Sequence, residues 1–151
     1  MRQLLILVAL LALAGCGTYQ ECTSCSSTEL AGGPKVTSSA WKDRVAVYSN
    51  NSAIQAKAPG MVKREFGLRR TVPVPDSYFL VRIHSCSSKR VIKLCLNVQY
   101  DGRILARKEF RTSLKEGCAD TQSRKILEDM LFEDSRKPFL NFVRRAMNDV
   151  G

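Results

Sequence analysis

Two stretches of alternating apolar and polar residues limit the fold of this chain more than any other feature. They span Tyr78–Ser85 and Val91–Tyr100, and the polar loop 86–90 joins them. Strict alternation is typical of strands that bury one face and expose the other. If Ser85 faces Ile92, every apolar residue of both strands falls on one side. The pattern therefore predicts an antiparallel hairpin in this register, whose opposite side carries Arg82, His84, Lys93, Cys95 and Asn97.

A third strand at 103–112 is predicted to extend the hairpin into a meander, because Asp101-Gly102 is a hairpin turn signal. A tight two-residue turn would set Arg107 and Glu109 against the apolar face of the hairpin. A three-residue loop with a bulge avoids this, and we prefer it. The bulged form puts Ile104, Ala106 and Phe110 on the apolar face.

The polar side of this meander is rich in cations. With the bulged loop, the third strand adds Arg103, Arg107, Glu109 and Arg111 to it. A surface of this kind favours anionic partners. We define the predicted basic face as Arg82, His84, Lys93, Arg103, Arg107 and Arg111.

Shorter signals place elements before the meander. The β-branched and aromatic run at 44–48 predicts a first strand. A short helix at 52–58, capped by Ser52, is expected to end at Pro59-Gly60, with a further helical turn at 61–66 before a glycine.

The segments on either side of the meander complete the predicted fold. Two prolines confine 68–74 to a sheet edge or a connector. A helical period runs over 121–133, and Pro138 suits the first turn of a second helix that continues to residue 150. We predict an α+β fold in which a small antiparallel sheet, a three-stranded meander plus an N-terminal strand, is covered on one face by the C-terminal helices. The covering stripe comprises Ile126, Leu127, Met130, Leu131, Phe139, Phe142, Val143, Ala146 and Met147.

The amino terminus has the features of an export signal. A short basic start precedes an uninterrupted apolar run at Leu4–Ala14. This run is too short to span a bilayer as a helix, which needs about 20 residues. It ends in Leu13-Ala14-Gly15-Cys16, which resembles the lipobox of bacterial lipoprotein signal peptides.

The lipobox resemblance implies cleavage before Cys16 and a covalent diacylglycerol and acyl chain on that cysteine, with no other cofactor. Several acyl chains hold a protein on a membrane, whereas one chain binds it only marginally. Gly17 resembles the sorting pattern of outer-membrane lipoproteins, so we expect the periplasmic face of the outer membrane. The chain would then consist of a signal peptide at 1–15, a lipidated flexible tether at 16–40 and a single α+β domain at 41–151.

The charge of the chain narrows its partners. The formal net charge is +10 and falls to +9 when Arg2 is lost with the leader. In an envelope compartment this favours anionic lipids or an acidic protein surface and disfavours nucleic acid. Charge that serves only solubility is the alternative interpretation.

Five cysteines besides the lipidated one are candidates for disulfides in an oxidising compartment. They are Cys22, Cys25, Cys86, Cys95 and Cys118. In the predicted hairpin register Cys86 and Cys95 lie four positions apart, about 13 Å, which is beyond disulfide reach. We therefore favour a bond from Cys118 to one of these two.

A thiol redox site and a metal site are less favoured interpretations of these cysteines. Cys22-Thr-Ser-Cys25 has C-x-x-C spacing, but it lies in a tether rich in Ser, Thr and Gly without the strand and helix that activate such a thiol. A zinc site would need His84 with Cys86, or Cys95, as its second pair, and the spacing matches no known metal framework.

The function expected from these features is not enzymatic, because no catalytic motif is found. The segments 75–80 and 101–106 resemble the sheet of curli-secretion and lipopolysaccharide-transport lipoproteins, which implies a similar small α+β domain. We expect a non-catalytic accessory or docking component of a secretion, conjugation or envelope-assembly complex. Direct binding of an anionic glycolipid or phospholipid is the first alternative, and a thiol redox or metal-binding lipoprotein is the second.

Overall fold

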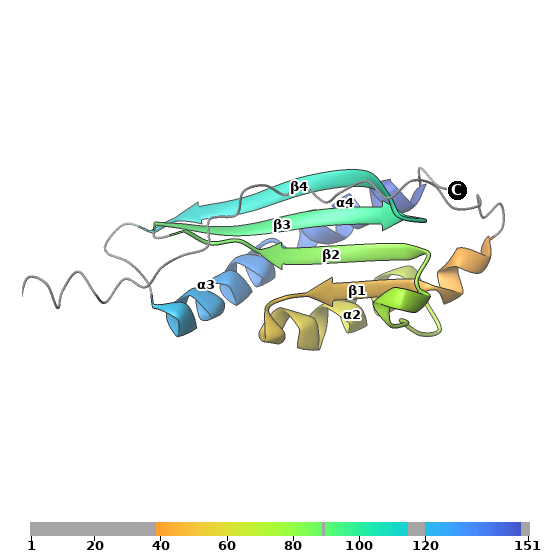
Figure 1. Cartoon of the computed structure of the whole chain (residues 1–151), viewed down its shortest axis with the longest axis horizontal. Helices are drawn as coiled ribbons and strands as arrows, with labels where there is room; N and C mark the ends of the chain where they lie inside the picture. Colours follow the sequence, from red (N-terminus) through yellow and green to blue (C-terminus); the bar gives the residue numbers. More distant parts are fainter. Residues whose placement is uncertain (1–38, 89, 115–119, 149–151) are drawn as a thin grey trace, which may run out of the picture.

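The computed structural model describes residues 39–88, 90–114 and 120–148. Four strands form one sheet in the order β1-β2-β3-β4, and three α-helices and two short 3₁₀ helices accompany them (Figure 1). In chain order the elements are η1 (Ser39–Asp43), β1 (Val45–Ser49), α2 (Ser52–Phe66), η2 (Val74–Asp76), β2 (Phe79–Ser85), β3 (Val91–Tyr100), β4 (Arg103–Ser113), α3 (Thr121–Asp134) and α4 (Arg136–Asn148).

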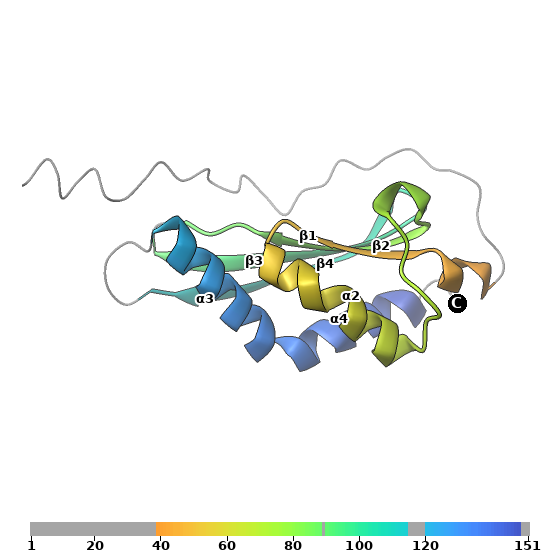
Figure 2. The ribbon, with the colours of Figure 1, turned by 90° about the horizontal axis from the view of Figure 1, so that it is seen from below.

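The predicted α+β class is confirmed, and the sheet is mixed. The strands β2, β3 and β4 form the expected antiparallel meander, whereas β1 pairs with β2 in parallel through the crossover helix α2. All three α-helices lie on the same side of the sheet (Figure 2). The cover of the apolar face therefore includes α2 as well as the two C-terminal helices.

The core lies between this helical layer and the sheet. Its largest fully buried side chains include Phe79 from β2, Phe132 from α3 and Phe139 from α4. Phe132 and Phe139 meet edge to face at 5.2 Å between ring centroids, which joins the two C-terminal helices. Each such side chain contributes roughly 1.5–3 kcal/mol through removal of apolar surface from water.

The β2–β3 register differs from the prediction by two residues. Ser85 pairs with Leu94, not with Ile92, and Phe79 pairs with Tyr100. The expected register was wrong because the pairing continues into the predicted polar loop: the Cys86 amide donates to the Lys93 carbonyl, and the Ser88 amide donates to the Val91 carbonyl. A shift of two leaves every side chain on its predicted face, since side chains alternate with a period of two.

The β3–β4 connection also differs from the prediction. Asp101 and Gly102 both have positive φ, at 51° and 75°, which matches the tight two-residue hairpin turn rather than the three-residue loop. The bulge exists, but it lies inside the strand at Leu105, between the pairs formed by Gln99 and Val98. It restores the alternation beyond it, so that Ala106 and Phe110 reach the apolar face as predicted.

Residues before the bulge lie on the faces opposite to those predicted. Ile104 pairs with Gln99 and so leaves the apolar face. Arg103 pairs with Tyr100, which packs against the core, and so leaves the basic face. The turn decides both positions, because the bulge acts only after them.

Helix α2 is continuous through Pro59 and Gly60, so the predicted break is wrong. Asn51, not Ser52, caps it, with its side-chain oxygen accepting from the amides of Ala53 and Ile54. A helix-interior proline costs about 3 kcal/mol. The helix continues because its buried stripe crosses the proline without interruption: Ile54, Ala58, Met61 and Val62.

The apolar stripe predicted for the first C-terminal helix is only partly buried. Ile126 and Met130 are 57% and 55% exposed, whereas Glu128 and Phe132 are buried. The ion pairs of Lys57 with Asp129 and Glu133, at 2.5 and 2.7 Å, join α2 to α3. The hydrogen bond from Lys57 also holds the pKa of Glu133 below its ordinary value.

Two glycines of α2 provide a test of its geometry. Gly60 lies in the helix interior with nothing within 4 Å of an added Cβ, so Gly60→Ala should stabilise the domain by about 0.5–1 kcal/mol. Gly67 ends the helix at φ +61°, so Gly67→Ala should destabilise it by about 1 kcal/mol. Urea unfolding of the two variants measures both changes. A loss of stability in Gly60→Ala would contradict a continuous helix.

Candidate functional site

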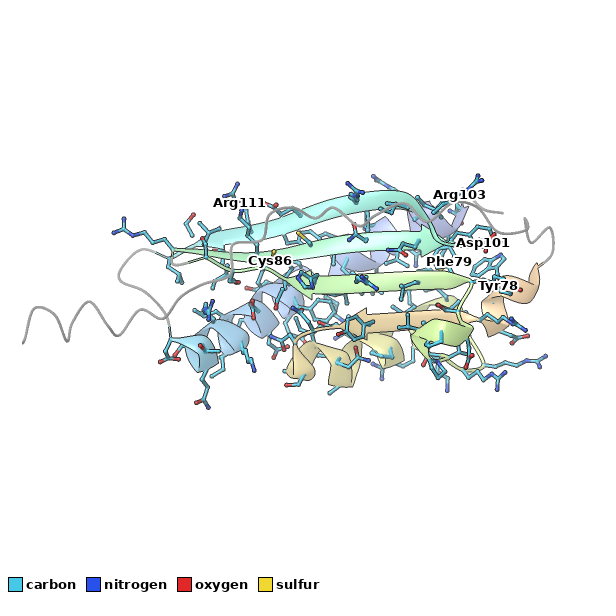
Figure 3. The ribbon with its side chains drawn as sticks, in the orientation of Figure 1. Tyr78, Phe79, Cys86, Asp101, Arg103 and Arg111 are labelled. Atoms are coloured by element: carbon cyan, nitrogen blue, oxygen red, sulfur yellow. The ribbon has the colours of Figure 1, made fainter. Side chains whose placement is uncertain are left out.

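The sheet face opposite the α-helices gathers most of the predicted basic residues. We define the open face as the side chains of the four strands that alternate with the core residues. Lys93 pairs with Arg111, and Arg107 pairs with Asn97, so cations from β3 and β4 lie side by side. Figure 3 shows Arg103 and Arg111 at opposite ends of β4. Of the predicted basic face, the structure brings together Arg82, His84, Lys93, Arg107 and Arg111.

The cations of the open face differ in their exposure. Arg107, Arg111 and His84 are exposed, whereas Arg82 and Lys93 are half-buried. Glu109 lies between the two exposed arginines, and its carboxylate is 3.7 Å from Arg111. A single exposed pair of this kind contributes little and is screened by salt. Among the exposed side chains that β4 places on this face beyond its bulge, there are two arginines and one carboxylate.

The centre of the open face is a row of side chains across all four strands. Tyr48, Arg82, Asn97 and Arg107 are consecutive partners in this row. The Arg82 guanidinium lies over the Tyr48 ring at 5.8 Å, a cation–π contact. Its orientation follows from the parallel pairing of β1 with β2, which sets Tyr48 beside Arg82.

Two polar atoms of this row are buried without a hydrogen-bond partner. Asn97 is 4% exposed, and its Oδ1 accepts no hydrogen bond. The Nε of the neighbouring Arg82 is likewise unpartnered. Such a buried group costs about 1–3 kcal/mol until a donor or acceptor satisfies it. The row thus contains one buried acceptor and one buried donor that make no hydrogen bond.

Sequence reasoning placed Asn97 on this face but did not count it in the basic face, and it missed Tyr48. The signal for Asn97 was its position in the strand alternation, between Cys95 and Gln99. No sequence pattern placed Tyr48 on this face, because its position beside Arg82 depends on the pairing of β1 with β2.

Both described cysteines belong to the open face. Cys86 and Cys95 are buried, and both are disulfide-bonded. The observed register sets Cys86 opposite Lys93 and Cys95 opposite His84, so they lie two positions apart. The predicted separation of four positions, and the distance argument built on it, is therefore wrong. Other predicted residues lie outside the described part of the chain: Cys16, Cys22, Cys25 and Cys118.

A depression of about 330 Å³ lies elsewhere, beside the start of β1. Its lining residues are the arginine that precedes β1 and residues of the segment between α2 and β2: Arg44, Arg70, Thr71, Val72, Pro73 and Asp76. Within residues 39–88, 90–114 and 120–148, no three His, Cys, Asp or Glu side chains converge as metal ligands. None of the helices described there is long and apolar enough to cross a bilayer.

Comparison with known proteins gives only distant likeness. No family model matches the chain, and no curated protein matches its sequence. Among solved structures, a Xanthomonas campestris protein of the DUF330 family is similar, with a TM-score of 0.43 and 9% identity over 89% of this chain and 97% of that one. A minor lipoprotein from Acinetobacter baumannii has a TM-score of 0.38 and 9% identity over 66% of this chain and 94% of that one. At these values neither likeness assigns a family or a function.

The state of the two described cysteines can be measured directly. Iodoacetamide applied to the unfolded, unreduced protein should leave Cys86 and Cys95 unmodified, because neither carries a free thiol. After reduction, both should be alkylated. Peptide mapping by mass spectrometry without reduction would also name their partners, and we predict Cys118 among them. Alkylation of either residue before reduction would contradict the structure.

Proposed function

We propose that this chain is a cell-envelope lipoprotein, anchored through Cys16 on the periplasmic face of the outer membrane, whose domain acts as a non-catalytic docking component. Its partner would be an acidic surface of a protein in a secretion, conjugation or envelope-assembly complex. The anchor is inferred from the lipobox-like Leu13-Ala14-Gly15-Cys16 after an apolar run of signal length. An anchored domain needs only a recognition surface to recruit a partner.

The observation that carries the docking role is the chemistry of the open face. The exposed Arg107 and Arg111 stand on an edge strand, and the unpartnered Asn97 Oδ1 lies inward of them. Cations at a rim steer an acidic partner, and inner polar groups add direction to the contact. Catalysis finds less support, because the described open face has one histidine, His84, whose cross-strand partner is the disulfide-bonded Cys95.

The lipid anchor is testable separately from the domain. Labelling cells with radioactive palmitate should acylate the wild-type chain and not the Cys16→Ser variant, because the thiol of that cysteine receives the lipid. Globomycin should cause the unprocessed form to accumulate. Processing that is unchanged by the drug would refute the anchor and leave the domain's surface unaffected.

Docking through the open face is tested by site-specific crosslinking. A photoreactive residue replacing His84 should form an adduct with an envelope protein in intact cells. Arg107→Glu with Arg111→Glu should reduce that adduct by about tenfold, because reversed charges repel an acidic partner. The matched control is Lys63→Glu with Arg64→Glu on α2, which changes the net charge equally on the helical side.

The outcome separates protein docking from the lipid alternative. An equal adduct in both variants would refute docking through the open face. Binding of the purified protein to anionic vesicles, lost in the β4 variant and retained in the α2 variant without any partner protein, would instead identify a lipid headgroup as the ligand.

A further inference from the structure

Cys86 and Cys95 need partners elsewhere in the chain. Both are disulfide-bonded, and they occupy diagonal positions across the β2–β3 hairpin, two residues apart. The Cα atoms of such a diagonal pair are about 7–8 Å apart. A disulfide joins Cα atoms that are about 4.4–6.8 Å apart. The two cysteines are therefore too far apart to bond to each other, and each bonds to another cysteine.

The remaining cysteines direct at least one of these bonds to the amino-terminal segment, which we define as residues 16–38. The chain has six cysteines, and the other four are Cys16, Cys22, Cys25 and Cys118. Cys118 can take only one of the two bonds, so the other must lead to the amino-terminal segment. A lipidated Cys16 has no thiol for a disulfide, which leaves Cys22 and Cys25.

Burial on the open face is a second observation that a segment lies over it. Cys86, Cys95 and Asn97 are only 5%, 2% and 4% exposed. All three lie on the face opposite the α-helices (Figure 2). Side chains on the uncovered face of an antiparallel sheet are normally in contact with water. These three side chains therefore mark a part of the open face that is covered.

The amino-terminal segment is long enough to reach this part of the face. The start of β1 lies beside Phe79. Cys95 pairs with His84, five residues further along β2, which is about 17 Å at 3.3 Å per residue. Cys25 precedes the first residue of η1 by 14 residues, which span up to about 46 Å when extended. Cys86 lies two positions beyond Cys95, still within this length.

The charge of the segment also suits the open face. Residues 16–34 contain two glutamates and no lysine or arginine, although the net charge of the whole chain is +10. The open face carries Arg82, Lys93 and Arg111. An anionic segment is attracted to such a surface.

We propose that the amino-terminal segment crosses the open face of the sheet and is fixed there by a disulfide from Cys22 or Cys25 to Cys86 or Cys95. When this bond forms, two thiols lose two protons and two electrons, which a protein disulfide of an oxidising compartment takes up by exchange. The segment that was predicted as a flexible tether is then a strap bonded to the domain.

The strap also orients the domain on the membrane, a consequence that rests on the proposed anchor at Cys16. Cys22 and Cys25 follow Cys16 by six and nine residues, which reach at most about 20 and 30 Å. Without the bond, the 23 residues from Cys16 to η1 would reach up to about 75 Å. The bond holds the open face close to the bilayer, so a protein that docks there lies at the membrane surface.

Peptide mapping without reduction tests the bond in the mature chain carrying Cys16→Ser. Trypsin puts Cys22 and Cys25 on one peptide that ends at Lys35, and it separates the other cysteines into 83–89, 94–103 and 116–124. The amino-terminal peptide should stay linked to 83–89 or 94–103 until reduction. An amino-terminal peptide linked to neither would overturn the proposal. Disulfide-linked dimers would identify a second copy as the source of the bonded cysteine and would also overturn it.

Serine variants test the same bond through the thiols that they release. Cys22→Ser with Cys25→Ser, in the chain carrying Cys16→Ser, should leave a free thiol at Cys86 or Cys95, which iodoacetamide labels in the unfolded, unreduced protein. The matched control is Thr23→Ala with Ser24→Ala, which should leave both cysteines unlabelled. Unlabelled Cys86 and Cys95 in the serine variant would contradict the strap.

The orientation is tested by neutron reflectometry of the lipidated protein on a supported phosphatidylcholine bilayer, which has no net charge. The domain should lie close to the bilayer in the wild type and in the alanine control, and it should extend further outward in the variant with Cys22→Ser and Cys25→Ser. Equal heights would refute the orientation.

The strap and the proposed function can fail separately. If Cys16 carries no lipid while the amino-terminal peptide maps to the open face, the strap stands and the anchor is wrong. If palmitate labels Cys16 while the peptide maps elsewhere, the anchor stands and the strap is wrong. The crosslinked adduct at residue 84 tests docking whichever of these results is found.

Discussion

Burial of the apolar face of the β2–β3 hairpin is the constraint on which the rest of the structure depends. The side chains of Phe79, Val81 and Ile83 on β2 and of Leu94, Leu96 and Val98 on β3 are completely removed from water. A hairpin cannot shield such a surface by itself, so α2, α3 and α4 pack against it. All three α-helices lie on that side, so no described α-helix covers the other face (Figure 2).

A buried polar network holds the helical layer in place against the hairpin. The Glu128 carboxylate accepts from Ser87 Oγ at 2.8 Å and from Asn51 Nδ2 at 3.4 Å. Asn51 also caps α2, and Ser87 receives the amide of Lys93 at the end of the hairpin. One buried carboxylate therefore joins α2, α3 and the hairpin turn, and its burial is sustained by these hydrogen bonds.

Much of the fold and part of the candidate site were predictable, and the errors have local causes. Alternation assigned Arg82, Lys93 and Asn97 to the uncovered face, and this survived a wrong register because the error was an even number of residues. The predicted faces of Arg103 and Ile104 were wrong because a three-residue loop was predicted where the structure has a two-residue turn. The apolar stripe predicted for α3 was partly wrong. Ile126 and Met130 fit a helical period, but they do not face the sheet.

The sequence by itself determined the α+β class and which residues of β2 and β3 share a face, because both depend on periodicity within a segment. Only the tertiary structure decided that β1 pairs in parallel with β2, that α2 runs through Pro59, and that the bulge lies at Leu105. The first two depend on contacts between segments far apart in the chain, whose packing energy outweighs local preference. The bulge depends on the pairing of β3 with β4 beyond their turn. The row of Tyr48, Arg82, Asn97 and Arg107 also comes from the tertiary structure, because its four residues lie on four different strands.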